Sequence, residues 1–232
     1  CVCGGCTDRP RPHRRHGGPD RGGASAFGPR VPCIMQKRHA CPPARSSRQS
    51  AHRCTLNPSP ASPHGQVKPQ FAYAAGKAPP SLDALYDRLL AADAYVMVTP
   101  EYNHAPSPAL VNILNHFGSS VFSFKPSAIV SYSQGQWGGC RAAVGLRPIL
   151  SELGCLPVSA MVHVPRAHQV LDETGTPTGG AKEAERWHGY AHRTWSQLQW
   201  WGTAAKLHKQ SNDPFAASPA FLSDPAQRNA AA

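Results

Sequence analysis

Short apolar runs alternate with amphipathic stretches over residues 82–207, as is typical of an α/β protein. Parallel strands that are buried on both faces appear as continuous apolar runs, and helices as apolar residues that recur every three or four positions. The expected strands span residues 94–98, 127–130 and 156–164. The expected helices span about 82–92, 107–118, 140–153 and 182–207. Strands that alternate with helices predict a doubly wound parallel sheet.

Local start and stop signals support these helix boundaries. Ser81 and Ser107 are suited to accept the free N–H groups of a first turn, and Pro108 suits the first helical position. Gly118 and Gly154 are suited to end the helices that precede them. The expected helices are therefore delimited by residue types that favour caps.

Two polar loops follow the first two expected strands. Residues 99–107 include the run TPEYNH, and residues 131–139 have the sequence SYSQGQWGG. In doubly wound sheets, ligands bind beyond the carboxyl ends of the strands. The pattern therefore predicts a ligand site formed by these two loops.

Charge and composition divide the chain into three parts. The formal net charge of the 232 residues is +11, but residues 1–70 hold twelve Lys and Arg against only two acids. Residues 1–67 form a basic segment rich in Pro, Gly and Cys, and we expect it to be disordered because it offers little apolar surface to bury. Residues 68–209 form the expected domain, and residues 210–232 an Ala- and Pro-rich flexible tail.

The basic segment does not indicate a metal site or a nucleic-acid site. Cys3 and Cys6 have a zinc-like spacing, but no second pair matches them. Phe27 is the only aromatic residue before Phe71, so the aromatic residues that would stack on bases are missing, and we expect no nucleic-acid partner. An apolar run of about 18 residues, which a membrane helix needs, is absent from the sequence.

The two loops and their flanks carry a resemblance to a known family. The order VTPEYNH, then IVSYS-x-GQWGG-x-RA, then L-x-x-LGC and LDE-x-G resembles the NADPH-dependent FMN reductases over about residues 68–209. The resemblance implies a flavodoxin-like fold and a cytoplasmic homodimer or homotetramer. It also implies an FMN-dependent oxidoreductase that takes hydride from NADPH or NADH. The acceptor would be a small molecule such as a flavin, a quinone, an azo compound or a metal oxyanion.

The resemblance places the flavin against the two loops. Tyr102 and Trp137 have rings that can stack on an isoalloxazine, and a glycine loop allows backbone N–H groups to approach its edge. The flavin carries the hydride chemistry, so no catalytic side chain is required. The expected cofactor-binding residues are Pro100, Glu101, Tyr102, Asn103, His104, Ser131, Ser133, Gln134, Gly135, Trp137, Gly138 and Gly139.

Structural alternatives exist for several of these residues. Asn103 and Gly138 are also suited to simple turns, Trp137 to an oligomer interface, and His104 to an ordinary loop. Cys140 and Cys155 are expected to be buried as small hydrophobic residues.

The resemblance is incomplete at its amino-terminal side. Family members begin with a βαβ unit whose first loop binds the FMN phosphate, and residues 1–67 contain no recognisable counterpart. Residues 46–50, SSRQS, have suitable residue types but no strand before them, so no phosphate role is assigned to them. The sequence therefore predicts a sheet without its first unit, in which strand 94–98 is an exposed edge. The alternative function is an inactive flavodoxin-like remnant, or an interaction module that cannot hold FMN.

Overall fold

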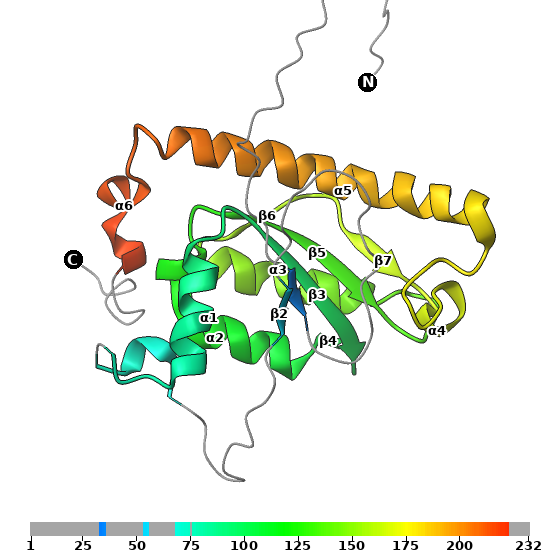
Figure 1. Cartoon of the computed structure of the whole chain (residues 1–232), viewed down its shortest axis with the longest axis horizontal. Helices are drawn as coiled ribbons and strands as arrows, with labels where there is room; N and C mark the ends of the chain where they lie inside the picture. Colours follow the sequence, from blue (N-terminus) through cyan, green and yellow to red (C-terminus); the bar gives the residue numbers. More distant parts are fainter. Residues whose placement is uncertain (1–32, 36–52, 56–67, 75, 223–232) are drawn as a thin grey trace, which may run out of the picture.

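A parallel sheet organises the molecule, with strands in the order β2-β1-β3-β5-β6. The computed structural model describes residues 33–35, 53–55, 68–74 and 76–222 (Figure 1). The parallel strands are β1 (Cys33–Met35), β2 (Arg53–Thr55), β3 (Tyr95–Tyr102), β5 (Pro126–Tyr132), β6 (Leu156–Pro157) and β7 (Val162–Val164). Because β6 and β7 pair with successive parts of β5, they share the last position. The result is the flavodoxin-like order 2-1-3-4-5, which confirms the predicted fold class.

Strands β1 and β2 correct the expectation that the first unit of the sheet is missing. Cys33 and Ile34 of β1 pair in parallel with Val96 and Met97 of β3, so residues 94–98 are not an edge strand. The sequence did not show these strands because three residues are too few to display a hydrophobic period, and their partners lie far along the chain. The rest of residues 1–67, with its expected disorder and its cysteine pair, lies outside the described residues.

The described helices are α1 (Pro80–Leu90), α2 (Pro108–Phe122), α3 (Cys140–Glu152), α4 (Ala167–Val170), α5 (Gly180–His208) and α6 (Pro214–Ala217), with short 3-10 turns η1 (Gln70–Ala72) and η2 (Pro219–Leu222). Four of these helices, α1, α2, α3 and α5, lie close to the predicted positions, whereas the short α4 and α6 were not predicted. Ser107 caps α2 as predicted, because its hydroxyl accepts a hydrogen bond from the N–H of Leu110 at 3.3 Å. Ser81 does not cap α1, which already begins at Pro80. Gly118 adopts φ 62° and interrupts α2, but a further helical turn follows to Phe122.

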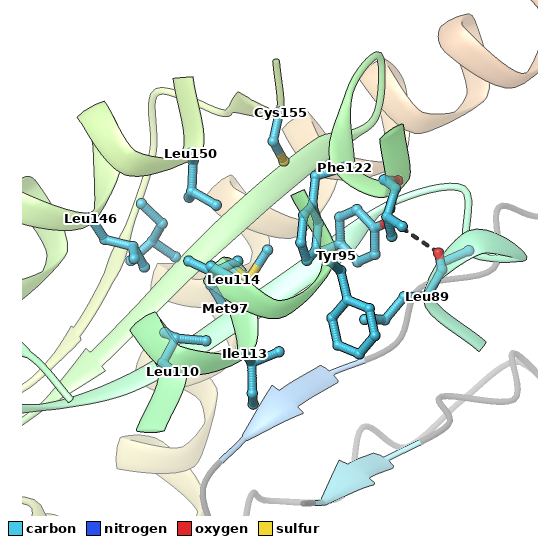
Figure 2. Packing of buried hydrophobic residues seen from close by; sticks show 14 of the residues in the cluster. Leu89, Tyr95, Met97, Leu110, Ile113, Leu114, Phe122, Leu146, Leu150 and Cys155 are labelled. Atoms are coloured by element: carbon cyan, nitrogen blue, oxygen red, sulfur yellow. Dashed lines mark hydrogen bonds between the residues drawn. The ribbon is translucent and has the colours of Figure 1, made fainter. Parts of the chain in front are cut away.

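Alternate residues of the strands serve two separate cores. Tyr95, Met97 and Ile129 pack with α1, α2 and α3 in the larger cluster, where Leu110, Leu114, Leu146 and Leu150 gather over β3 (Figure 2). Ala94, Ala128, Val158 and Leu198 form the smaller cluster, to which α5 contributes Leu198. Figure 1 shows α5 running along one side of the sheet, opposite α1 and α2. The sheet therefore has helices on both faces, as a doubly wound fold requires.

The segment after residue 210 contributes structure where we expected a flexible tail. Phe215 of α6 and Phe221 of η2 each meet the ring of Phe124 edge to face, with centroids 5.7 and 5.4 Å apart. The Ser119 hydroxyl donates a hydrogen bond to the carbonyl of Phe221 at 2.9 Å. Residues 214–222 thus pack against the end of α2 and the start of β5.

The described part of the chain contains neither a helix that could span a membrane nor a group of side chains that suits a metal ion. None of the described helices is long and apolar enough to cross a membrane. Within the same part of the chain, no three His, Cys, Asp or Glu side chains are grouped in a way that suits a metal ion.

Candidate functional site at the carboxyl ends of the strands

The first predicted loop is a β-hairpin that extends β3. β3 continues to Tyr102 and pairs with β4 (Ala105–Pro106) in antiparallel fashion. Asn103 and His104 form the two-residue turn with φ values of 50° and 63°, both in the left-handed region that type I′ turns require. Residues 99–102 therefore belong to a strand instead of the expected loop, and the exposed tip presents Tyr102, Asn103 and His104.

Glu101 ties this hairpin to helix α3. Its Oε2 accepts hydrogen bonds from the backbone N–H groups of Arg141 and Ala142 at 3.0 and 3.1 Å. These are N–H groups of the first helical turn, which lack partners inside the helix, and the helix dipole favours a negative charge there. The carboxylate of Glu101 thus holds the hairpin in place, a role that the sequence did not predict.

Removing this carboxylate is expected to loosen the hairpin. Glu101→Ala leaves two N–H groups without their acceptor and should lower the free energy of unfolding by about 1–2 kcal/mol. Glu101→Gln keeps an oxygen acceptor but loses the charge, so its loss should be smaller. Urea unfolding of both variants tests this order, and an alanine variant as stable as the wild type would contradict it.

The second loop is packed onto the strands through two glycines. Gly138 and Gly139 have φ values of 60° and 77°. A Cβ on Gly138 would lie 2.9 Å from the nitrogen of Pro165, and one on Gly139 would lie 3.0 Å from the Cβ of Ser131. A Cβ at either position would collide with the strand ends, so the closure of the turn requires glycine at both positions in addition to the expected approach to a ligand. A Cβ on Gly135, in contrast, meets nothing nearer than 3.8 Å.

Two serines support this loop, one in the loop itself and one, Ser131, that belongs to the end of β5 instead of the expected loop. The buried Ser131 hydroxyl donates to the carbonyl of Gly138 at 2.8 Å and lies 2.7 Å from Nδ1 of His163. The Ser133 hydroxyl donates to the carbonyl of Gly135 at 3.1 Å. Both side chains therefore shape the loop.

A third segment, at the end of β7, completes the site. The N–H of Arg166 donates to the carbonyl of Gly135 at 3.0 Å, and that of Ala167 to the carbonyl of Ser133 at 3.0 Å. Arg166 adopts φ 46° and is exposed beside the loop. We did not select His163 or Arg166 from the sequence, although the rule that placed the other two loops at strand ends applies equally to the third strand.

Aromatic and basic side chains set the local electrostatics. Burial raises the pKa of the Tyr132 phenol, and the nearby Tyr102 raises it further. Burial lowers the pKa of His163, so this imidazole is neutral at neutral pH. The Arg141 guanidinium lies over the ring of Trp137, 5.8 Å from its centroid. The site therefore presents aromatic rings, with the Arg141 guanidinium over one of them and Arg166 exposed beside the loop.

The predicted site residues divide into a supported interior and an exposed rim. Because Pro100 and Tyr132 are paired in register, the hairpin and the glycine loop start side by side. The interior residues are Pro100, Glu101, Ser131, Ser133, Gly138 and Gly139. The exposed residues, which we call the loop rim, are Tyr102, Asn103, His104, Gln134, Gly135 and Trp137.

Comparison with known proteins agrees with this geometry. Residues 55–169, which run from the end of β2 through all three site segments, match the family model described as NADPH-dependent FMN reductase. Residues 55–169 of this chain belong to the NADPH-dependent FMN reductase family. The loop rim therefore lies inside the family segment.

Relatives of this family segment include several oxidoreductases. An NAD(P)H-dependent FMN reductase of Pseudomonas aeruginosa is 34% identical over 101 residues, which cover 42% of this chain and 55% of the relative. A probable NADPH:quinone oxidoreductase of Oryza sativa subsp. japonica is 36% identical over 76 residues (32% and 38%). An NADPH azoreductase of a Bacillus species is 46% identical over 52 residues (22% and 29%). The chain thus spans about half the length of these curated relatives, or less.

A solved structure supports the fold of the family segment and its surroundings. A flavoenzyme NAD(P)H:(acceptor) oxidoreductase from Paracoccus denitrificans superposes with a TM-score of 0.52 at 19% identity. The superposition covers 73% of this chain and 97% of that protein. The two proteins share the flavodoxin-like fold.

Proposed function

We propose that the loop rim binds FMN and that the chain is an FMN-dependent NAD(P)H oxidoreductase. The observation that carries the proposal is the convergence of an aromatic hairpin tip and a glycine loop at the carboxyl ends of β3, β5 and β7, inside the family segment. In flavodoxin-like sheets this edge is where ligands bind. The acceptor would be a small molecule such as a flavin, a quinone, an azo compound or a metal oxyanion.

The rim residues suit the planar part of a flavin. Tyr102 and Trp137 are 53% and 59% exposed, so their rings are available to stack on an apolar plane. The amides of Asn103 and Gln134 can hydrogen-bond a pyrimidine edge, and Gly135 has open space on its Cβ side. The residues that follow β1, where this fold binds a phosphate, lie outside the described residues. The proposal therefore concerns the ring end of FMN.

This chain's own residues position the cofactor instead of transferring protons. FMN supplies hydride acceptance from NADPH or NADH and the onward delivery of reducing equivalents when it is bound. Glu101 accepts hydrogen bonds from the first turn of α3, and the neutral His163 is hydrogen-bonded to Ser131. Both side chains therefore orient the loops. We accordingly assign no side chain as a catalytic acid or base.

A flavin titration tests the proposal. The full chain is purified and titrated with FMN while flavin fluorescence and visible absorption are followed. NADPH and NADH are then added in turn without oxygen. We expect saturable quenching with a shifted visible band, followed by bleaching with at least one nucleotide. An unchanged flavin spectrum at all protein concentrations would overturn the proposal and favour the remnant or interaction module.

Assembly and compartment belong to the same proposal. We propose a homodimer or homotetramer, supported by the large exposed side chains of Trp200 and Trp201 on α5. We also propose a cytoplasmic location, supported by the thiols of Cys140 and Cys155, which form no disulfide in the described part of the chain. Light scattering of the purified chain tests the first, because a monomer at all concentrations would contradict it. Fractionation of cells that make the chain tests the second.

A further inference from the structure

Ser131 stands between the glycine turn and His163. Its hydroxyl oxygen lies 2.8 Å from the carbonyl oxygen of Gly138 and 2.7 Å from Nδ1 of His163. The three groups come from β5, the glycine loop and β7. Ser131 itself is fully buried, so water does not compete for these contacts.

A hydroxyl has one proton, and this decides the tautomer of the histidine. The carbonyl of Gly138 can only accept, so the Ser131 proton is directed to it. The Ser131 oxygen is then an acceptor toward His163, and Nδ1 of His163 must carry a hydrogen. Because burial keeps this imidazole neutral, Nε2 carries none. This is opposite to the tautomer that a free imidazole side chain favours in water.

The backbone of His163 is anchored separately. Its N–H donates to the hydroxyl of Tyr190 on α5 at 3.1 Å, so β7 is held to the helix at this residue. The turn also closes on the same residue, since a Cβ on Gly138 would lie 3.1 Å from both the carbonyl carbon and the Cβ of His163. The backbone of His163 is therefore held in place while its imidazole contacts Ser131.

We propose that His163 is a positioning residue that holds the Gly138–Gly139 turn in place through Ser131, with the hydrogen on Nδ1. The turn starts α3 and completes the loop that carries Gly135 and Trp137. Its effect on flavin binding rests on the function proposed above. The tautomer and the hydrogen-bond chain are properties of the protein without any ligand.

The tautomer is tested by NMR in the absence of flavin. The full chain is labelled with ¹⁵N-histidine, and long-range ¹H–¹⁵N correlations are recorded at pH 7.5. The signal that disappears in His163→Asn identifies the residue among the twelve histidines. We expect that signal to show a protonated Nδ1 and an unprotonated Nε2, and to change toward the Nε2–H form in Ser131→Ala. An Nε2–H pattern in the wild type would overturn the inference.

Three variants test the positioning role. Asparagine can place an N–H donor where Nδ1 of histidine lies, whereas leucine has no donor. We expect His163→Leu and Ser131→Ala to weaken FMN binding about tenfold, and His163→Asn to recover most of that loss. Urea unfolding of each variant checks that it folds. If His163→Leu does not fold, Ser131→Ala provides the test in its place. Equal losses in His163→Asn and His163→Leu would overturn the positioning role.

The two proposals fail in different ways. If the wild type binds no FMN but its His163 carries the hydrogen on Nδ1, the proposed function is wrong and the hydrogen-bond chain stands. If the wild type binds FMN and His163 shows the Nε2–H form, the function stands and the positioning role is wrong.

Discussion

Gly138→Ala is expected to lower the free energy of unfolding by about 2–4 kcal/mol and to weaken FMN binding about tenfold or more. Two effects add. A φ of 60° strains any residue that has a Cβ, and the new Cβ would lie 2.9 Å from the backbone nitrogen of Pro165. Backbone cannot rotate away as a flexible side chain can, so the turn must lift from β7. Urea unfolding and fluorescence titration with FMN measure the two losses.

Gly135→Ala is the matched control for this prediction. It adds the same methyl group to the same loop, but the nearest atom is the Ser133 hydroxyl at 3.8 Å, and the backbone is not in the left-handed region. We expect its unfolding free energy to change by less than about 0.5 kcal/mol. Equal destabilisation by both alanines would show that the close approach at Gly138 is not what requires glycine.

Leu146→Ala is expected to lower the free energy of unfolding by about 3 kcal/mol, within the range seen for fully buried leucines. Leu146 is 0% exposed and belongs to the larger core cluster, together with Leu110 and Leu150 (Figure 2). Its truncation removes apolar contact and leaves a cavity between α3 and β3. Because α3 begins at the glycine turn, flavin affinity should also fall. Urea unfolding followed by circular dichroism measures the loss of stability.

Val144→Ala, on the same helix, is the control for the core prediction. Val144 is 57% exposed, so its truncation removes little buried surface, and alanine has the better helix propensity. Its stability should stay within about 0.5 kcal/mol of the wild type. A loss like that of Leu146→Ala would mean that helix α3 itself, and not its buried face, limits stability.

Much of the fold was accessible from local pattern. α2 begins where Ser107 and Pro108 indicated, and α3 spans Cys140–Glu152 against a prediction of 140–153. These elements are long enough to show a hydrophobic period and have residue types that favour caps. β1 and β2 have only three residues each, which is too short to show a hydrophobic period. Parallel pairing far along the chain creates them, and such pairing has no local sequence signal.

The sequence indicated where the candidate site lies, but not the contacts that its residues make. The rule that ligands bind at the carboxyl ends of parallel strands selected the two loops, and the family segment contains both. It did not show that Glu101 faces α3 or that Gly138 faces β7, because each contact joins segments that are distant in the sequence. Asn103 and His104 were expected in a polar loop, whereas pairing of Glu101 with Pro106 makes them a hairpin turn.

The sequence by itself determined the alternation of strands and helices, the two loops at the strand ends and the family resemblance, because these depend on residue type and short spacing. Tertiary structure alone decided which other segments of the chain those residues contact. It completed the sheet with β1 and β2, turned Gly138 and Gly139 against the strands, and brought Ser131 to His163. Such contacts depend on which strands pair and in which register, and the same residue types are compatible with many pairings and registers. Only the packing of the complete sheet against its helices selects one pairing and one register.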